Sequence, residues 1–275
     1  MGKLDGRVAL ISGGARGQGR SHALTLAKEG ADIIIFDICK QIASVEIAMA
    51  RKSDLDETAD MVRQTGRRVI AMLGDVRDTS SLNDVVGAGL KEFGKIDIVV
   101  ANAGILSFGP TEALPDDVWD DMIAVNLTGV YKTVRAALPS MIERKQGGAI
   151  VLTSSTAALR PYANHIHYVA AKNGVTGIMR ALAHEMAKHR IRVNCVAPAA
   201  CHTDFIINPT VFQLFTGNGN ISEEDAIPAF KTLNLMDEPW IYPQDVSNAI
   251  AWLVSDEARF VTGITLPVDL GLTNK

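Results

Sequence analysis

The sequence is poor in cysteine, has no excess of positive charge and lacks long apolar runs, and each absence excludes a class of protein. The three cysteines, Cys39, Cys195 and Cys201, have the spacing of neither a zinc site nor a disulfide scaffold. The net charge of -4 offers no basic face for nucleic acid. Without about 18 uncharged apolar residues in a row, no transmembrane helix is expected. We therefore expect no metal, no nucleic-acid partner and no membrane partner.

The N-terminal residues also lack the features of an export signal. The segment MGKLDGRVALISGG has no long apolar core and no small-residue cleavage site. Together with the low cysteine count, this favours the reducing cytoplasm as the location of the protein.

Short apolar runs alternate with amphipathic stretches along the whole chain. Near-continuous Val and Ile runs predict strands that are covered on both faces, and the stretches between them predict helices. This alternation favours parallel strands with right-handed crossovers, hence an α/β, doubly wound sheet of about seven strands, the Rossmann fold, with helices on both faces. The expected strands are 8–11, 33–36, 69–73, 96–101, 149–153, 192–196 and 264–268, and the expected helices 17–29, 54–65, 79–92, 117–144, 166–188 and 243–254.

Two segments interrupt the alternation. Residues 38–53 separate the second strand from its helix by far more than an ordinary strand-to-helix loop. Residues 204–240 contain several prolines and glycines with apolar residues between them, a composition typical of a lid or binding loop. No internal repeat or low-complexity linker is visible, so residues 1–275 are expected to form a single domain.

A glycine cluster follows the first strand and opens the first helix. Gly13, Gly17 and Gly19 allow tight turns and the close approach of a pyrophosphate to the helix N-terminus. Asp37 closes the second strand, where a carboxylate binds the 2′-hydroxyl of NAD and repels the 2′-phosphate of NADP. A plain strand-to-helix turn and a solvated aspartate are the alternatives. Arg16 is a counter-signal, because a basic residue in this loop could bind a 2′-phosphate, but Asp37 carries more weight.

With these residues the chain resembles the short-chain dehydrogenase/reductase family along nearly its whole length. The motifs occur in the family's order, although Ser12 replaces Thr, Ala101 replaces the first Asn of NNAG and Ala199 replaces the glycine after Pro198. The resemblance implies the catalytic residues Asn126, Ser155, Tyr168 and Lys172. It implies the cofactor-binding residues Gly13, Arg16, Gly17, Gln18, Gly19, Asp37, Asp75, Val76, Asn102, Ala103, Gly104, Tyr168, Lys172, Pro198, Cys201 and Thr203.

A narrower resemblance is to the actinobacterial carveol-dehydrogenase-like group, on the glycine-loop region followed by an insert. It implies a folded flap near the cofactor at residues 38–53, tightly held NAD and an external redox partner of the mycofactocin type. Family members are commonly homotetramers, built on helices that match residues 117–144 and 166–188, with the C-terminal strand at a second interface.

The spacing of Tyr168 and Lys172 gives the family's chemistry a physical basis. Residues four apart share a helix face, and a nearby Lys⁺ favours the phenolate, so the pKa of Tyr168 is expected to fall toward the working range of a base. Tyr168 would then be the base in alcohol oxidation and the acid in ketone reduction. The resemblance implies that Ser155 binds the substrate oxygen, whereas its neighbour Ser154 does not, and that Asn126 holds a water that links Lys172 to solvent. An exposed amphipathic pair is the alternative for Tyr168 and Lys172.

The substrate side is expected to be apolar. Residues 156–167 and the lid at 204–240 should form its wall, and we expect an alicyclic or terpenoid alcohol as substrate. The candidate wall residues are Leu159, Tyr162, His165, His167, Phe205, Ile206, Val211, Phe212, Leu214 and Phe215. The alternatives are a 3-ketoacyl or steroid reductase of the same family, a non-enzymatic dinucleotide-binding regulator, and a lid whose apolar face only packs on the core or on another subunit.

Overall fold

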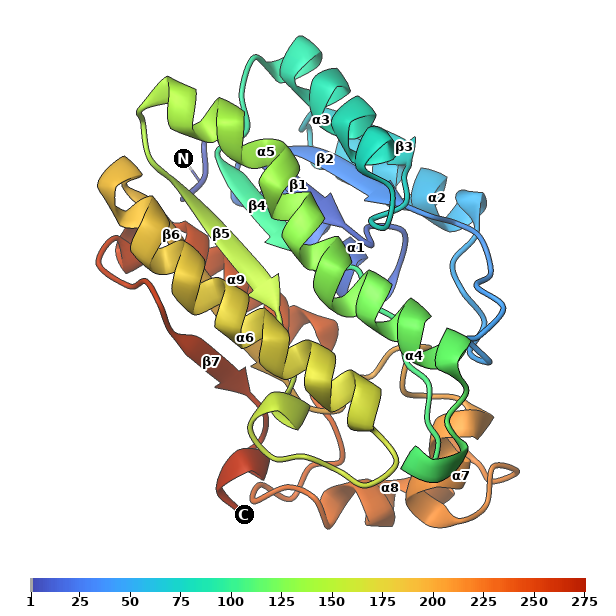
Figure 1. Cartoon of the computed structure of the whole chain (residues 1–275). Helices are drawn as coiled ribbons and strands as arrows, with labels where there is room; N and C mark the ends of the chain where they lie inside the picture. Colours follow the sequence, from blue (N-terminus) through green and yellow to red (C-terminus); the bar gives the residue numbers. More distant parts are fainter. Residues whose placement is uncertain (1) are drawn as a thin grey trace.

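Seven parallel strands form one sheet in the computed structural model, which describes residues 2–275 (Figure 1). The strand order is β3-β2-β1-β4-β5-β6-β7, which confirms the predicted doubly wound sheet. The order reverses between β1 and β4, so the carboxyl ends of these two strands leave a crevice where ligands of such sheets bind. The strands are β1 (Val8–Ser12), β2 (Asp32–Asp37), β3 (Val69–Leu73), β4 (Ile98–Ala101), β5 (Gly148–Thr153), β6 (Ile191–Pro198) and β7 (Thr265–Val268).

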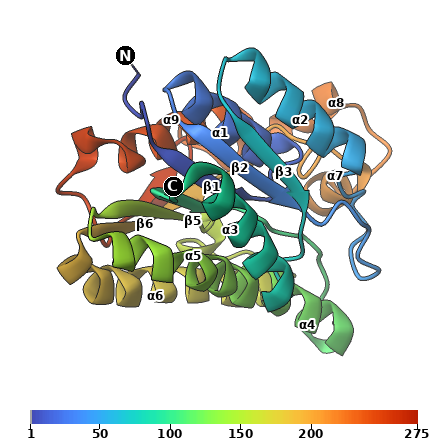
Figure 2. The same ribbon diagram turned by 90° about the horizontal axis from the view of Figure 1, so that it is seen from above.

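Helices cover both faces of the sheet, as seen from above (Figure 2). Side chains of β2 alternate between the two faces. Ile33 and Ile35 pack in the core below α1 and α9, whereas Ile34 and Phe36 pack in the core on the side of α3, α5 and α6. These helices are α1 (Gly17–Lys28), α2 (Lys52–Gln64), α3 (Thr79–Phe93), α5 (Val130–Arg144), α6 (Ile166–Met186) and α9 (Pro243–Val254).

The helix expected over residues 117–144 is interrupted. It consists of α4 (Asp116–Ile123), a π-helical turn at Ala124–Gly129 and α5. Single π-helical turns within α-helices are rare and occur frequently at functional sites. The helical pattern expected over residues 117–144 is confirmed, but the π-helical turn within it was not predicted, because apolar periodicity does not report an extra residue in one turn.

Both irregular segments are folded. In the insert, Ile42, Val45 and Ile47 are buried in the main core, and Ser44 donates a hydrogen bond of 2.7 Å to Asp121 of α4. The lid contains α7 (Pro209–Thr216) and α8 (Glu223–Lys231), whose N-termini are capped by Asn208 and Ser222.

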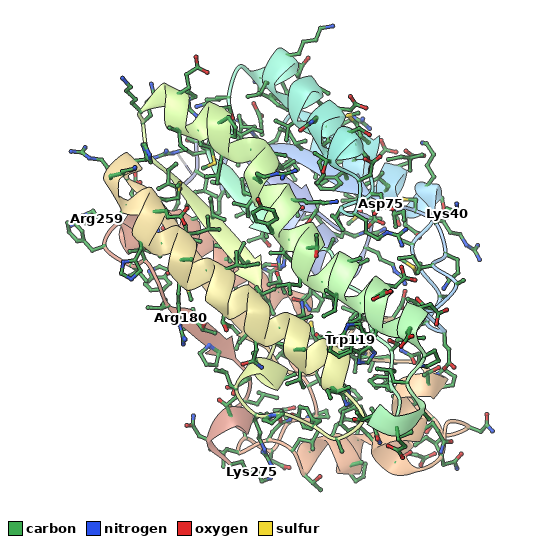
Figure 3. The ribbon with its side chains drawn as sticks, in the orientation of Figure 1. Lys40, Asp75, Trp119, Arg180, Arg259 and Lys275 are labelled. Atoms are coloured by element: carbon green, nitrogen blue, oxygen red, sulfur yellow. The ribbon has the colours of Figure 1, made fainter. Side chains whose placement is uncertain are left out.

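The C-terminal residues lie against the end of the lid, near Lys275 in Figure 3. Lys275 Nζ donates to the carbonyl oxygens of Thr232 and Asn234 at 2.6 and 2.7 Å. No helix within residues 2–275 has the length and apolarity needed to cross a membrane.

Candidate active site

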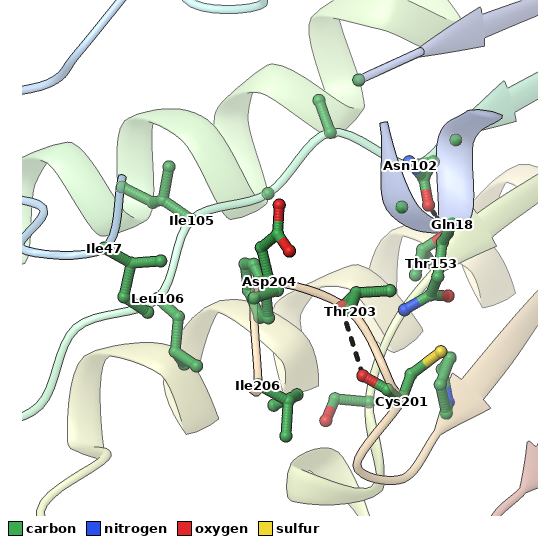
Figure 4. Close-up of a pocket in the computed structure, with 18 of the residues that line it drawn as sticks. Gln18, Ile47, Asn102, Ile105, Leu106, Thr153, Cys201, Thr203, Asp204 and Ile206 are labelled. Carbon is green, nitrogen blue, oxygen red and sulfur yellow. Dashed lines mark hydrogen bonds between the residues drawn. The ribbon is translucent and has the colours of Figure 1, made fainter. Parts of the chain in front are cut away.

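A cavity of about 700 Å³ opens at the carboxyl ends of the strands. Its wall brings together the loops after β1, β2, β4, β5 and β6, the insert and the lid. Figure 4 shows Ile47 of the insert, Leu106 after β4 and Ile206 of the lid facing this space from different segments. Every residue predicted to bind cofactor lines the cavity.

The geometry of the glycine loop agrees with the prediction that a ligand can approach its backbone closely. A Cβ on Gly19 would lie 1.9 Å from the carbonyl oxygen of Gly13, and a Cβ on Gly13 would lie 2.9 Å from Ala103 Cα. Gly13 and Gly17 also have positive φ angles of 68° and 56°, which disfavour side chains. The loop is thus a backbone surface that delivers the N-terminus of α1 to the cavity.

Asp37 lies at the end of β2 beside this loop. Its carboxylate accepts hydrogen bonds from the backbone N–H groups of Ala15 at 3.3 Å and Cys39 at 3.1 Å. Burial raises the pKa of Asp37 above its usual value, while the two hydrogen bonds and the charge of Arg16 oppose that rise. The carboxylate is therefore held in place between the glycine loop and the insert.

Arg16 is engaged by the protein itself. Its Nη1 lies 2.9 Å from Asp204 Oδ2 at the start of the lid, and its Nη2 donates to the carbonyl oxygen of Ala48 in the insert. Arg16, the residue whose charge would favour NADP, thus joins the glycine loop to both irregular segments.

Polar residues at the ends of β1, β3 and β4 form defined hydrogen bonds within the protein. Asp75 holds Arg77, whose Nε and Nη2 lie 2.8–3.1 Å from its carboxylate oxygens, and Arg77 continues to Asp121 at 2.9 Å. The Ser12 hydroxyl accepts from the N–H groups of Asn102 and Ala103, both at 3.0 Å. Ser12 thereby ties the end of β1 to the turn after β4.

The residues after β6 close the far side of the cavity. Pro198 ends that strand, and Thr203 Oγ1 donates to the carbonyl oxygen of Cys201 at 3.1 Å, the dashed line in Figure 4. A Cβ on Gly17 would lie 3.4 Å from Thr203 Cγ2, so the two loops nearly touch.

Ser155, Tyr168 and Lys172 converge on the cavity between β5 and α6. The Ser155 hydroxyl accepts from the N–H of Ala157 at 3.1 Å and lies close enough to Tyr168 to lower the pKa of the phenol. Lys172 Nζ lies 5.5 Å from the ring centroid of Tyr168 and donates to the carbonyl oxygen of Thr153 at 2.8 Å. A serine hydroxyl, a phenol and an amine thus meet at one place in the wall.

Burial sets the pKa values of this group. It raises the pKa of Tyr168 to about 12, against the opposing hydrogen bond from Ser155. It lowers the pKa of Lys172 to about 8, because the ammonium group is removed from water. The predicted fall in the pKa of Tyr168 was therefore wrong for this arrangement, since desolvation outweighs Ser155, the one group that lowers this pKa.

Asn126 lies behind the cavity wall in the π-helical turn and is fully buried. Its Oδ1 accepts from the N–H of Ile105 at 2.8 Å, and its Nδ2 donates to the carbonyl oxygen of Ile105 at 2.9 Å. A Cβ on Gly104 would lie 3.4 Å from Asn126 Oδ1 and 3.8 Å from Lys172 Nζ. Asn126 holds the segment after β4 in place, and its link through water stays a prediction.

The expected substrate wall is correct only in part. Tyr162, His165, Phe205, Ile206 and Phe215 line the cavity, whereas Leu159 is exposed outside it. The remaining candidates also lie away from the cavity: His167 is buried against Ser107 at 2.8 Å, Val211 and Phe212 pack in the core, and Leu214 contributes nothing to the wall. The lid therefore packs on the core with one face and lines the cavity with another.

Several residues of the cavity wall were not predicted from the sequence. Ile105, Leu106 and Phe108 follow β4, and the convergence of parallel strand ends could have pointed to them. His202 and Glu223, 2.7 Å apart, join the loop after β6 to α8. Leu272 comes from the C-terminal segment, and no motif marks it. Within residues 2–275, no group of three or more His, Cys, Asp or Glu side chains could hold a metal ion.

Comparison with known proteins agrees with this geometry. The family model of the short chain dehydrogenases matches residues 7–210, which is most of the chain. The chain belongs to the short-chain dehydrogenase family.

Individual members of the family match over the full length. The chain is 45% identical to (-)-trans-carveol dehydrogenase of Rhodococcus erythropolis, with 100% of both chains covered. It is 33% identical to cyclohexanol dehydrogenase of a Rhodococcus species, with 98% of this chain and 97% of the relative covered. The crystal structure of carveol dehydrogenase from Mycobacterium avium in complex with NAD superposes with a TM-score of 0.98 at 45% identity, and both chains are covered completely.

Proposed function

We propose that this protein is an NAD-dependent alcohol dehydrogenase that interconverts an apolar cyclic secondary alcohol and its ketone. The observation that carries the proposal is the convergence of Ser155, Tyr168 and Lys172 on the cavity that the glycine loop and Asp37 also line. Two relatives named for cyclic alcohols and a similar structure in complex with NAD support it.

The residues of the cavity fit NAD. The glycine-rich loop and the N-terminus of α1 would hold the pyrophosphate, Asp37 the adenosine ribose, and Tyr168 with Lys172 the nicotinamide ribose. NAD, when bound, supplies the redox chemistry by taking up or returning the hydride.

The side chains of the protein handle the proton. Tyr168 takes the proton of the alcohol oxygen during oxidation and returns it to the carbonyl oxygen during reduction. Ser155 binds the same oxygen and, through its hydrogen bond to Tyr168, favours the phenolate against the effect of burial. Lys172 is oriented by its hydrogen bond to Thr153.

The apolar wall favours an apolar substrate. Phe205, Ile206 and Phe215 of the lid line the same cavity as Leu106 and Phe108. Such a wall leaves the hydroxyl groups of a polyol or sugar unpaired, and this has a free-energy cost. A 3-ketoacyl or steroid reductase remains the alternative within the family.

Turnover of a substrate panel tests the proposal. With NAD, cyclohexanols and monocyclic terpenoid alcohols should be oxidised, and polyols, 3-ketoacyl thioesters and steroid ketones should react far more slowly. Tyr168→Phe should still bind NAD but lose about 10²–10⁴-fold in kcat, because it lacks the acid and base. Oxidation of polyols alone, or a Tyr168→Phe variant that turns over at the original rate, would contradict it.

We further propose that the protein is a cytoplasmic homotetramer whose NAD is held by the insert and reoxidised by an external partner of the mycofactocin type. The buried apolar residues of the insert, which line the same cavity, support tight retention. NAD should then remain with the protein through extensive dialysis, as measured by absorbance after denaturation. Rapid exchange with added labelled NAD would argue for an ordinary dissociable cofactor.

A further inference from the structure

Three segments that are distant in the sequence meet at the guanidinium group of Arg16. One nitrogen lies 2.9 Å from Asp204 at the start of the lid, and another donates to the carbonyl oxygen of Ala48 in the insert. All three residues line the cavity, and Asp204 projects into the space between the lid and the glycine loop in Figure 4. The Arg16 side chain as a whole is 29% exposed.

This guanidinium group is close to the carboxylate proposed to bind the adenosine ribose. Asp37 accepts a hydrogen bond from Ala15, the residue before Arg16, and feels the charge of Arg16. Two opposite charges therefore lie close together where the adenosine ribose is proposed to bind. Asp37 repels a 2′-phosphate, whereas a free Arg16 would attract it, because arginine binds phosphate oxygens through two parallel N–H groups.

We propose that Asp204 acts, beside Asp37, as a second determinant of the choice of NAD over NADP by engaging Arg16. The inference rests on the proposed function, because it concerns which dinucleotide the site accepts. Asp204 offsets the charge of Arg16 and occupies its Nη1, which is then not available to a 2′-phosphate. A residue on the substrate side of the cavity thereby contributes to cofactor selection.

The exposure of the ion pair sets the expected size of the effect. The Asp204 side chain is 75% exposed, so salt screens its attraction to Arg16, and the pair by itself is weak. Asp37 is the stronger barrier, since its carboxylate is held against the ribose position by two backbone hydrogen bonds. Removing Asp204 alone should therefore increase the affinity for a ligand with a 2′-phosphate by only about two- to fivefold.

The two carboxylates should act together rather than independently. When Asp37 is removed, Arg16 is still engaged by Asp204; when Asp204 is removed, Asp37 still repels the phosphate. The double variant alone presents to the 2′-phosphate an Arg16 that no carboxylate engages and that only the carbonyl oxygen of Ala48 still holds. Its gain should exceed the product of the two single gains, which is the signature of coupled residues in a double-mutant cycle.

Calorimetric titration with 5′-ADP and 2′,5′-ADP, after removal of any retained dinucleotide, tests this directly. Asp204→Asn should tighten 2′,5′-ADP about two- to fivefold and leave 5′-ADP within twofold, and the gain should shrink at high salt. The same gain should disappear in an Arg16→Met background. Asp237→Asn is the matched control, because Asp237 is an exposed lid aspartate with its own ion pair to Lys231 at 3.2 Å.

The outcomes separate the inference from the proposed function. An unchanged or equally weakened affinity for both ligands in Asp204→Asn, with an unchanged melting temperature, would show that Asp204 only fastens the lid, and would overturn the inference. A gain that persists without Arg16 would overturn it as well. Failure of the wild-type protein to bind either 5′-ADP or NAD would instead refute the proposed dinucleotide site.

Discussion

The two adjacent serines after β5 differ in what their hydroxyl groups contact. Ser155 acts on the phenol of Tyr168 and lowers its pKa, whereas Ser154 donates to the backbone carbonyl of Lys172 at 3.0 Å. Only the first contact opposes the effect of burial on the pKa of Tyr168. The spacing of thirteen residues to Tyr168 selects the same serine in the sequence.

Ser155→Ala should lower kcat for alcohol oxidation by about 10²–10³-fold, because it removes a donor to the oxygen on which charge develops. It should also move the rising limb of the pH profile to higher pH, because the pKa of Tyr168 rises without that hydrogen bond. Ser154→Ala is the control and should keep the limb in place. A shift of the limb in Ser154→Ala and not in Ser155→Ala would reverse the assignment.

The order of the motifs identifies the candidate catalytic residues in the sequence, but it does not predict their pKa values or their ion pairs. Ser155, Tyr168 and Lys172 could be selected because their spacing is fixed by one strand end and one helical turn. The raised pKa of Tyr168 could not be predicted from the sequence, because it depends on how much water the rest of the chain excludes. The same holds for Arg16, whose partner Asp204 lies 188 residues away.

At the scale of elements, a buried histidine joins α1 to α9. His22 is fully buried, and its Nδ1 lies 2.8 Å from Ser247 Oγ. Burial lowers its pKa to about 3, so it stays neutral in the folded protein. An unfolded chain takes up this proton near pH 6.5. The contribution of His22 to stability is therefore complete above about pH 6.5 and is lost as the pH falls toward 3.

His22→Leu should flatten the pH dependence of the free energy of unfolding by up to about 1.4 kcal/mol per pH unit between pH 4 and 6. Urea unfolding at several pH values measures this slope. His184→Leu, a change at an exposed position of α6, serves as the control and should retain it. An identical slope in His22→Leu and the wild-type protein would show that other groups carry the acid sensitivity.

The strands were predictable because a sheet covered on both faces requires continuous apolar runs, and β3 has the bounds expected for it. The insert and lid were recognised only as interruptions. Their folding depends on contacts with distant elements, such as Ser44 with Asp121 of α4. The π-helical turn around Asn126 is likewise held by hydrogen bonds to Ile105, a residue of another segment.

At the scale of the whole molecule, two large aromatic side chains are exposed along the helices expected to form a tetramer. Trp119 of α4, marked in Figure 3, is 37% exposed, and Tyr131 of α5 is 44% exposed. Aromatic side chains are enriched in protein interfaces. They lie on the segment at 117–144 that the family resemblance assigns to an interface.

Light scattering after size exclusion should give four times the chain mass for the wild-type protein. Tyr131→Asp should lower the oligomeric state, because a carboxylate would be buried without a partner at the interface. Lys52→Glu, at an exposed position of α2, should leave the assembly unchanged. A monomeric wild-type protein would remove the basis for the tetramer.

The C-terminal segment has a practical consequence for handling the protein. Leu272 lines the cavity, its carbonyl oxygen accepts from Arg160 at 3.0 Å, and Lys275 is fastened to the end of the lid. An affinity tag or fluorescent fusion appended after Lys275 would strain the anchorage of the lid and alter entry of the alcohol. Tags for purification and imaging therefore belong at the opposite terminus.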